Sequence, residues 1–300
     1  MASDELTAAD HMQSVSPTRG NELHGKQLPA VKAPGSRPSI ATASASHGTA
    51  RGASELDPAR ILICPRAQPA RTTRYRAKID SISPQSRRHS FESEPECFLG
   101  VSLENRNFEP PRFQALLEWV CRRYRRCKIL VGDSIHRLTL QARTSLPADQ
   151  ALHNALMLGQ KFIHENDAIV AQYRALSQIE FTTCAEIQSS DCYATHHSSI
   201  SAYFQDSPAF RASVEGFGVR YHRHDWDSLS PSDRELRLRM SSDYFLEEFA
   251  IFACLVERGV KVMVYPGSFS TLAEIADCRF PGVSKELESL CVASLHFKKR

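Results

Sequence analysis

The stretch CFLGVSLENRNFEPPRF, residues 97–113, decides the fold. Its apolar start, residues 97–101, has the composition of a buried β-strand and places Ser102 at the carboxyl end of that strand. A polar loop follows, and Pro110-Pro111 then begin a helix, because proline lacks only an N–H that the first helical turn leaves unpaired. Ligands bind at the carboxyl ends of strands in open parallel sheets. Ser102 is therefore a candidate nucleophile, although strand-end serines also serve as caps and turn residues.

The residues after this stretch complete a βαβ unit. An amphipathic helix is indicated by the spacing of Phe113, Leu116, Leu117, Val120 and Cys121. The next apolar run, residues 128–133, predicts a second buried strand that ends in Asp133. Strand, helix and strand in this order favour parallel pairing.

Further elements follow from the same patterns. We expect strands at residues 74–82, 179–184 and 260–265, and helices within residues 134–178, 185–215, 230–258 and 271–277. Tyr244 and Glu248 are four residues apart and so project from one helical face. The basic residues 298–300 at the C-terminus are expected to be solvated. The whole pattern predicts an α/β fold with a parallel sheet flanked by helices.

Composition divides the chain in two. Residues 1–72 are rich in Ser, Ala, Pro, Gly and Arg, and they cannot bury enough apolar surface to order the chain. We expect them to be a disordered basic tail and residues 73–300 to be one catalytic domain. Residues 1–90 carry a net charge of +6 and residues 91–300 one of −3, so a nucleic-acid partner would be held by local clusters.

Other classes of protein are disfavoured. The nine cysteines are irregularly spaced, which argues against a secreted disulfide framework. No zinc spacing, dinucleotide fingerprint or P-loop is present, and no apolar window is long enough to span a membrane. We expect a cytoplasmic protein without metal, cofactor or membrane.

Three strand ends supply the candidate chemistry. Ser102, Asp133 and Tyr265 are expected in one crevice, with Tyr244 and Glu248 on a helix at its rim. The loops after these strands offer no obvious histidine, and the second glycine of a hydrolase elbow is missing around Ser102. An enzyme of this kind would need a substrate that is already activated.

Five blocks of sequence resemble the tRNA-dependent cyclodipeptide synthases: LGVSLENRNF, LLEWVCRRYRRCK, ILVGD, YFLEE and VMVYP, in that order between Phe98 and Ile275. The resemblance implies a monomeric Rossmann-like domain, similar to the catalytic domain of class Ic aminoacyl-tRNA synthetases. It implies an aminoacyltransferase that uses two aminoacyl-tRNAs per turnover and no cofactor. The product would be a cyclic dipeptide, a 2,5-diketopiperazine, of secondary metabolism.

The resemblance also assigns roles to residues. Ser102 matches the nucleophile, Tyr244 and Glu248 match the pair that holds the α-amino group, and Tyr265 matches a proton relay. Substrate-binding positions are expected at Gly100, Asn105, Phe98, Leu130, Asp133, Glu247, Ile251 and Met263. Pro266 and the long tail point to the fungal branch that makes arginine-containing products, for which Glu104, Asp133, Asp243 and Glu247 could pair with a guanidinium.

The expected docking site for tRNA differs from the site used by well-known members of the family. The helix at residues 149–178, densely basic in well-known members, carries only Lys161 and Arg174 as permanent cations. We therefore expect tRNA to contact a basic cluster formed by Arg122, Arg123, Arg125, Arg126 and Lys128, with residues 234–239 or the tail as alternatives. Two other functions remain open, a non-catalytic binding protein for aminoacyl-tRNA and a serine esterase.

Overall fold

The computed structural model describes residues 74–268 and 270–300. The expected tail, residues 1–72, lies outside the described residues. The strands are β1 (Tyr75–Ser83), β2 (Glu96–Val101), β3 (Arg126–Val131), β4 (Gln178–Thr183), β5 (Val262–Pro266) and β6 (Cys291–Lys299). The α-helices are α1 (Pro110–Cys121), α2 (His136–Thr144), α3 (Ala148–Ala171), α4 (Cys184–Gln188), α5 (Asp191–Asp206), α6 (Pro208–Tyr221), α7 (Pro231–Glu257), α8 (Ser270–Ala276) and α9 (Lys285–Glu288). Every strand and helix expected from the sequence is present within a few residues of its expected place.

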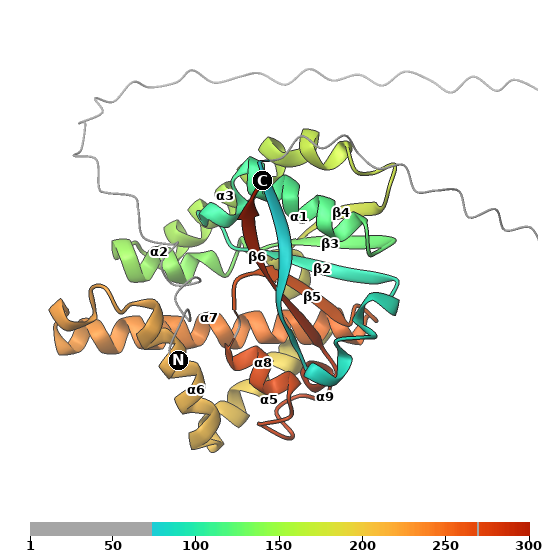
Figure 1. The fold of residues 1–300 in the computed structure, drawn as a ribbon. Helices are drawn as coiled ribbons and strands as arrows, with labels where there is room; N and C mark the ends of the chain where they lie inside the picture. The colour runs from blue at the N-terminus through green and yellow to red at the C-terminus, as the bar shows by residue number, and fades with distance from the viewer. Residues whose placement is uncertain (1–73, 269) are drawn as a thin grey trace, which may run out of the picture. The chain divides into compact units, whose positions relative to one another are not determined.

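The six strands form one sheet in the order β1-β6-β5-β2-β3-β4. Neighbouring strands from β6 to β4 pair in parallel, as predicted. The expectation of a wholly parallel sheet is corrected at one edge, because β1 pairs with β6 in the antiparallel sense. Strand β6 itself was not anticipated. Figure 1 shows β1 and β6 side by side, although they come from opposite ends of the described chain.

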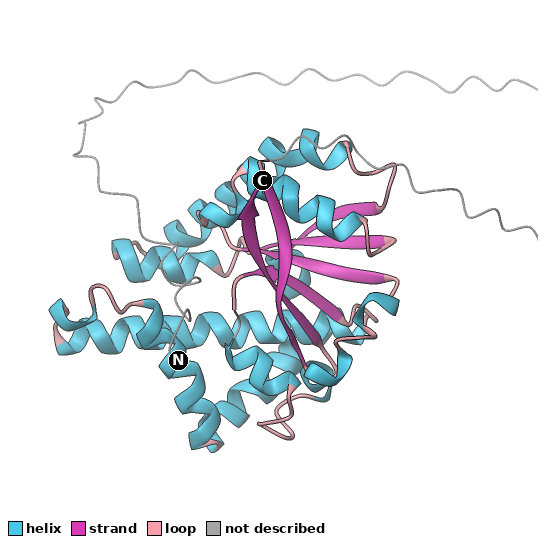
Figure 2. Cartoon of the chain, in the orientation of Figure 1, coloured by secondary structure: helices cyan, strands magenta, loops and turns pink. Residues whose placement is uncertain are grey.

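The order of the strands places helices on both faces of the sheet. The chain moves outward from β2 through α1 to β3 and through α3 to β4, and then returns to the other side of β2 to form β5 and β6. Because such crossovers are right-handed, the outward and returning connections cover opposite faces. Figures 1 and 2 show α1 and α3 on one side of the sheet and α7 with α5 on the other. The strand order therefore reverses between β2 and β5.

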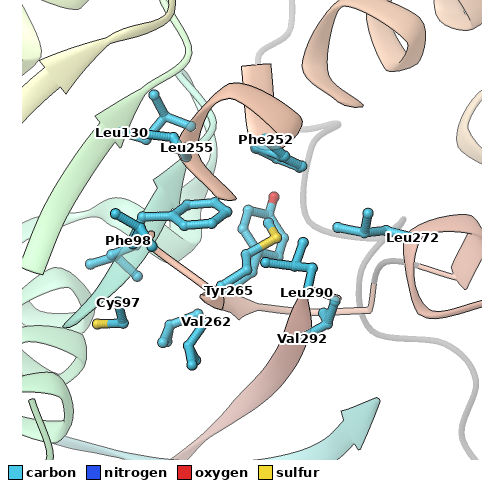
Figure 3. Close-up of a cluster of buried hydrophobic side chains, with 14 of the residues drawn as sticks. Cys97, Phe98, Leu130, Phe252, Leu255, Val262, Tyr265, Leu272, Leu290 and Val292 are labelled. Carbon is cyan, nitrogen blue, oxygen red and sulfur yellow. The ribbon is translucent and has the colours of Figure 1, made fainter. Parts of the chain in front are cut away.

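The core lies between the sheet and these helices. Strand β2 is buried along almost its whole length, and α1 buries the apolar stripe that was predicted from its spacing. Helix α7 begins at a cap in which the Ser230 hydroxyl accepts from the Asp233 N–H, and the chain leaves it through Gly259 at φ +92°. Figure 3 shows Phe98 of β2, Phe252 of α7 and Tyr265 of β5 in one cluster. The two central strands and α7 thus share one packed interior.

Within residues 74–268 and 270–300, no three His, Cys, Asp or Glu side chains gather as metal ligands would. In the same residues, none of the helices combines the length and apolar character that crossing a membrane requires.

The C-terminus is held more firmly than expected. Lys298 and Lys299 are exposed, but both belong to β6. Arg300 donates to both carboxylate oxygens of Glu118 in α1, at 2.8 and 3.1 Å, and its N–H donates to the Arg74 carbonyl. Glu118 is 6% exposed and also pairs with Arg122. A buried carboxylate therefore fastens the last residue of the chain to the first helix.

We expect Arg300→Ala to lower the free energy of unfolding by about 1 kcal/mol, because a buried carboxylate loses one of its two cationic donors. Urea unfolding at neutral pH measures this change. Lys298→Ala, two residues earlier in β6, serves as the control and should change stability by less than about 0.5 kcal/mol. Equal losses in the two variants would contradict the importance of the Glu118 contact.

Candidate functional site

The candidate site lies where the strand order reverses. Ser102 follows the end of β2, and Tyr265 is near the end of the adjacent strand β5. The Ser102 Oγ and the Tyr265 Oη are 3.0 Å apart and share a hydrogen bond. Ligands bind in open α/β sheets at such a reversal, in the crevice outside the strand ends. The two side chains expected at neighbouring strand ends are thus in direct contact.

The loop after Ser102 is tied to β5 by two asparagines. The Asn105 side-chain amide donates to the Tyr265 Oη at 3.4 Å, and its carbonyl oxygen accepts from the Asn107 N–H. Asn107, which sequence analysis did not single out, donates to the Pro266 carbonyl at 3.1 Å. These bonds fix the position of the Tyr265 hydroxyl relative to Ser102.

Glu248 supplies a buried carboxylate from α7. It is 7% exposed, and its Oε2 has no hydrogen-bond partner. Burial raises the pKa of Glu248 to about 8, so the carboxyl holds its proton at neutral pH. Burial also raises the pKa of Tyr265 and, together with the nearby Glu248, that of Tyr244. An unpaired buried carboxyl is suited to receive a cationic group.

These side chains line a cavity of about 760 Å³. Ser102, Asn105, Tyr244, Glu248 and Tyr265 are all on its wall. The remaining wall comes chiefly from α2, the end of α6, the middle of α7 and the strands β1 and β6. Its charged groups are the cations Arg112, Arg143, Arg220, Arg223 and Lys299 and the acids Asp80, Glu248 and Glu274. This volume is within the range in which proteins bury organic ligands.

A second cavity, of about 10 Å³, adjoins Ser102 and Glu248. Of the residues expected to line an aminoacyl pocket, Gly100, Leu130 and Met263 are on its wall. Phe98 and Ile251 are completely buried and line neither cavity, so they pack in the core. The apolar space beneath Ser102 is therefore very small in this structure.

The acids proposed for an arginine side chain have other partners. Asp133 is 5% exposed and accepts from the N–H groups of Ser134 and Ala185. Glu247 forms an ion pair with Arg137 and accepts from Gln188. Glu104 and Asp243 also lie outside the wall of the large cavity. None of these four carboxylates is placed to meet a guanidinium there.

The cavity wall includes histidines that the sequence did not reveal. His136, at the start of α2, is 2% exposed, and its Nε2 is 3.3 Å from the Glu104 Oε2. The expectation concerned the loops after the strands, and His136 belongs to the helix α2. Glu104 also contacts Arg143, and its pKa is lowered chiefly by the His136 ring. Even so, the Ser102 hydroxyl bonds to Tyr265 and to none of the histidines in the described chain.

The basic cluster of residues 122–128 lies at the amino ends of the strands, opposite to Ser102. Arg126 pairs in register with Glu96 at the start of β2, whereas Ser102 follows its end. Six residue steps separate Glu96 from Ser102, about 20 Å along the strand. Arg122, Arg123, Arg126 and Lys128 each form an ion pair with a glutamate. The cluster expected to contact tRNA is thus remote from Ser102.

A family model matches most of the described chain. The model described as "Cyclodipeptide synthase" matches residues 81–254, more than half of the sequence. The matched range contains Ser102, Tyr244 and Glu248, while Tyr265 lies beyond it. A comparison with curated proteins finds none that matches this sequence.

Solved structures show the same fold at low sequence identity. A cyclodipeptide synthase from Fluoribacter dumoffii has 20% identity and a TM-score of 0.63, over 75% of this chain and 100% of its own. A protein from Mycobacterium tuberculosis has 16% identity and a TM-score of 0.54, over 78% and 97%, and its description relates cyclodipeptide synthetases to type I tRNA synthetases. A cyclodipeptide synthase from Candidatus Glomeribacter gigasporarum, bound to Phe-tRNAPhe, has 16% identity and a TM-score of 0.50, over 68% and 88%.

Proposed function

This chain belongs to the cyclodipeptide synthase family, and we propose that it joins the amino acids of two aminoacyl-tRNAs into a 2,5-diketopiperazine through an aminoacyl ester on Ser102. The observation that carries the proposal is the contact of Ser102 with Tyr265 in a cavity that also holds the unpaired carboxyl of Glu248. The relative bound to Phe-tRNAPhe supports aminoacyl-tRNA as the substrate class. We further propose that the enzyme acts as a monomer and that residues 73–300 form its catalytic domain.

The first step is an exchange of esters. The Ser102 Oγ attacks the aminoacyl carbonyl, a bond forms to Oγ, and the bond to the tRNA ribose oxygen breaks. The hydroxyl proton passes to that ribose oxygen through Tyr265, whose Oη is 3.0 Å from Oγ. One ester replaces another, so the exchange needs little driving energy and no nucleotide or metal.

Glu248 is proposed to control the protonation of the substrate's α-amino group. Its pKa, about 8, lies close to the value of about 7.7–8.0 for an ordinary α-amino group. A proton therefore moves between the two groups at little energetic cost. Tyr244 lies one helical turn away and lines the same cavity, where its hydroxyl can hold the amine.

The second aminoacyl-tRNA completes the product. The freed amine on Ser102 attacks the ester carbonyl of the incoming aminoacyl-tRNA and forms the first amide. The bond to the ribose oxygen of the second tRNA breaks, that oxygen takes a proton from the amine, and a dipeptide is left on the serine. The new terminal amine then attacks the serine ester, closes the ring and returns the proton to the Ser102 Oγ. Closure is intramolecular, which can contribute about 7 kcal/mol in a favourable geometry.

The mass of the product identifies the two amino acids. Arginine as one of them stays a proposal that rests on the tail and on Pro266. In this cavity its guanidinium would meet Asp80 or Glu274, because the four acids first considered lie elsewhere.

Incubation of the purified protein with a charged tRNA pool, followed by mass spectrometry, tests the function. We expect diketopiperazines with charged tRNA and none with free amino acids, ATP and uncharged tRNA. Binding of charged tRNA without turnover would favour the non-catalytic alternative. Release of free amino acids without a cyclic product would favour the esterase.

A further inference from the structure

One wall of the large cavity combines aromatic rings with a cation. Phe217 and Tyr221 are four residues apart near the end of α6, and Arg220 lies between them in the sequence. This spacing places all three on neighbouring parts of one helical face. All three line the cavity that contains Ser102. We call this set the α6 wall.

The proposed substrate must bring a nucleotide to this cavity. In an aminoacyl-tRNA the reacting ester is on the ribose of the last adenosine. Ser102 can reach the ester only if that adenosine and its 5′-phosphate lie at the cavity as well. A volume of about 760 Å³ leaves room for more than an aminoacyl group.

The chemistry of the α6 wall matches a nucleotide. Aromatic rings stack on bases, and an arginine guanidinium binds phosphate. The Phe217 ring meets the Phe245 ring edge to face, with centroids 4.6 Å apart, so its position is fixed. The Arg220 guanidinium is 5.7 Å from the centre of the Phe217 ring and donates to the Ser270 Oγ at 3.0 Å. Among the described residues, no carboxylate forms an ion pair with Arg220.

Two of the other cations of the cavity have partners that restrict them. Arg112 lies over the rings of Tyr75 and Phe297 and donates to Asn107. Arg143 is paired with Glu104. Arg220, by contrast, is exposed, and its partners are a neutral hydroxyl group and an aromatic ring.

We infer that the α6 wall holds the terminal nucleotide of the aminoacyl-tRNA, with the adenine against Phe217 and Tyr221 and its 5′-phosphate on Arg220. This assignment rests on the proposed function. It places the recognition of the tRNA end in the same cavity as Ser102.

Two small probes test the assignment by binding alone. Both are adenosines with a non-hydrolysable 3′-aminoacylamide, one with a 5′-phosphate and one with a free 5′-hydroxyl. Arg220→Gln should weaken the phosphorylated probe about tenfold and leave the other unchanged, since it removes a charge-assisted contact to phosphate. Phe217→Leu should weaken both probes about fivefold or more, since it removes a stacking surface.

Arg211→Gln is the matched control. Arg211 is on the same helix, and its guanidinium lies 5.7 Å from the Phe204 ring, but it does not line the cavity. It should affect neither probe. Circular dichroism and thermal unfolding confirm that all three variants are folded.

Loss of affinity for both probes in Arg220→Gln, or for neither, would overturn the phosphate contact. No effect of Phe217→Leu on either probe would overturn the stacking. Both failures can occur while the wild-type protein still makes diketopiperazine from charged tRNA, in which case the proposed function stands and only the assignment of the α6 wall is lost.

Discussion

Ser102→Ala is expected to lower the rate of diketopiperazine formation about a thousandfold or more, because the variant has no atom that can carry the aminoacyl ester. Intact-protein mass spectrometry gives a second measurement. Wild-type protein supplied with one kind of aminoacyl-tRNA should gain the mass of one aminoacyl group, and Ser102→Ala should gain none.

Ser134→Ala is the matched control for this experiment. Ser134 also follows the end of a central strand, but its hydroxyl bonds to Gln188 in α4 and does not line either cavity. This variant should keep both the product and the covalent adduct. An adduct that persists in Ser102→Ala would remove Ser102 from its proposed role.

Glu248→Gln is expected to lower product formation about a hundredfold or more, because the amide keeps the shape of the side chain but cannot exchange a proton with the α-amino group. The same substitution should make the protein more stable. In the folded state burial raises the pKa of Glu248 from 4.5 to about 8. Between these values the folded chain binds a proton that the unfolded chain has lost.

The contribution of this carboxyl to the stability of the wild type therefore falls as the pH rises from about 4.5 to about 8. The difference in the free energy of unfolding between Glu248→Gln and wild type should be small at pH 4.5, grow with pH, and level off above pH 8. The full size of this difference is on the order of 5 kcal/mol. Chemical unfolding of both proteins at a series of pH values measures the difference.

Glu247→Gln separates this effect from a general change in charge. The neighbouring Glu247 is paired with Arg137 and Gln188, so its loss should destabilise the protein at neutral pH. A gain of stability in both variants, or in neither, would contradict the buried, unpaired state of Glu248.

Sequence periodicity was sufficient to predict a helix or a strand where one buried surface dominates the environment of the segment. The apolar run before Ser102 and the spacing along α1 predicted elements that the structure contains. The same reasoning placed Ser102 and Tyr265 at adjacent strand ends, and their hydroxyl groups are in contact. Two short patterns and the rule for parallel strands thus placed the centre of the site.

Strand β6 was missed because its pattern is ambiguous. Cys291–Lys299 mixes small, polar and basic residues, and its first five are buried without alternation. A strand covered on both faces lacks the period of two that marks a half-exposed one. The antiparallel edge formed by β1 and β6 therefore became visible only in the fold.

The partners of charged residues also could not be predicted from the sequence. Asp133 follows a central strand, as predicted, yet it caps backbone N–H groups instead of facing the cavity. His136 was overlooked because it is on a helix, five residues beyond the end of β3, and only the turn of the chain brings it to the wall. Such contacts join segments that are distant in the sequence, and no periodic pattern predicts them.

The contact between Ser102 and Tyr265 has a consequence for water. A tyrosine whose pKa is raised by burial keeps its proton at neutral pH, so it does not activate a water molecule as a histidine base would. We expect the ester on Ser102 to hydrolyse slowly even though the cavity is open. The aminoacyl-enzyme can then persist until a second aminoacyl-tRNA binds, and few turnovers end in the release of a free amino acid.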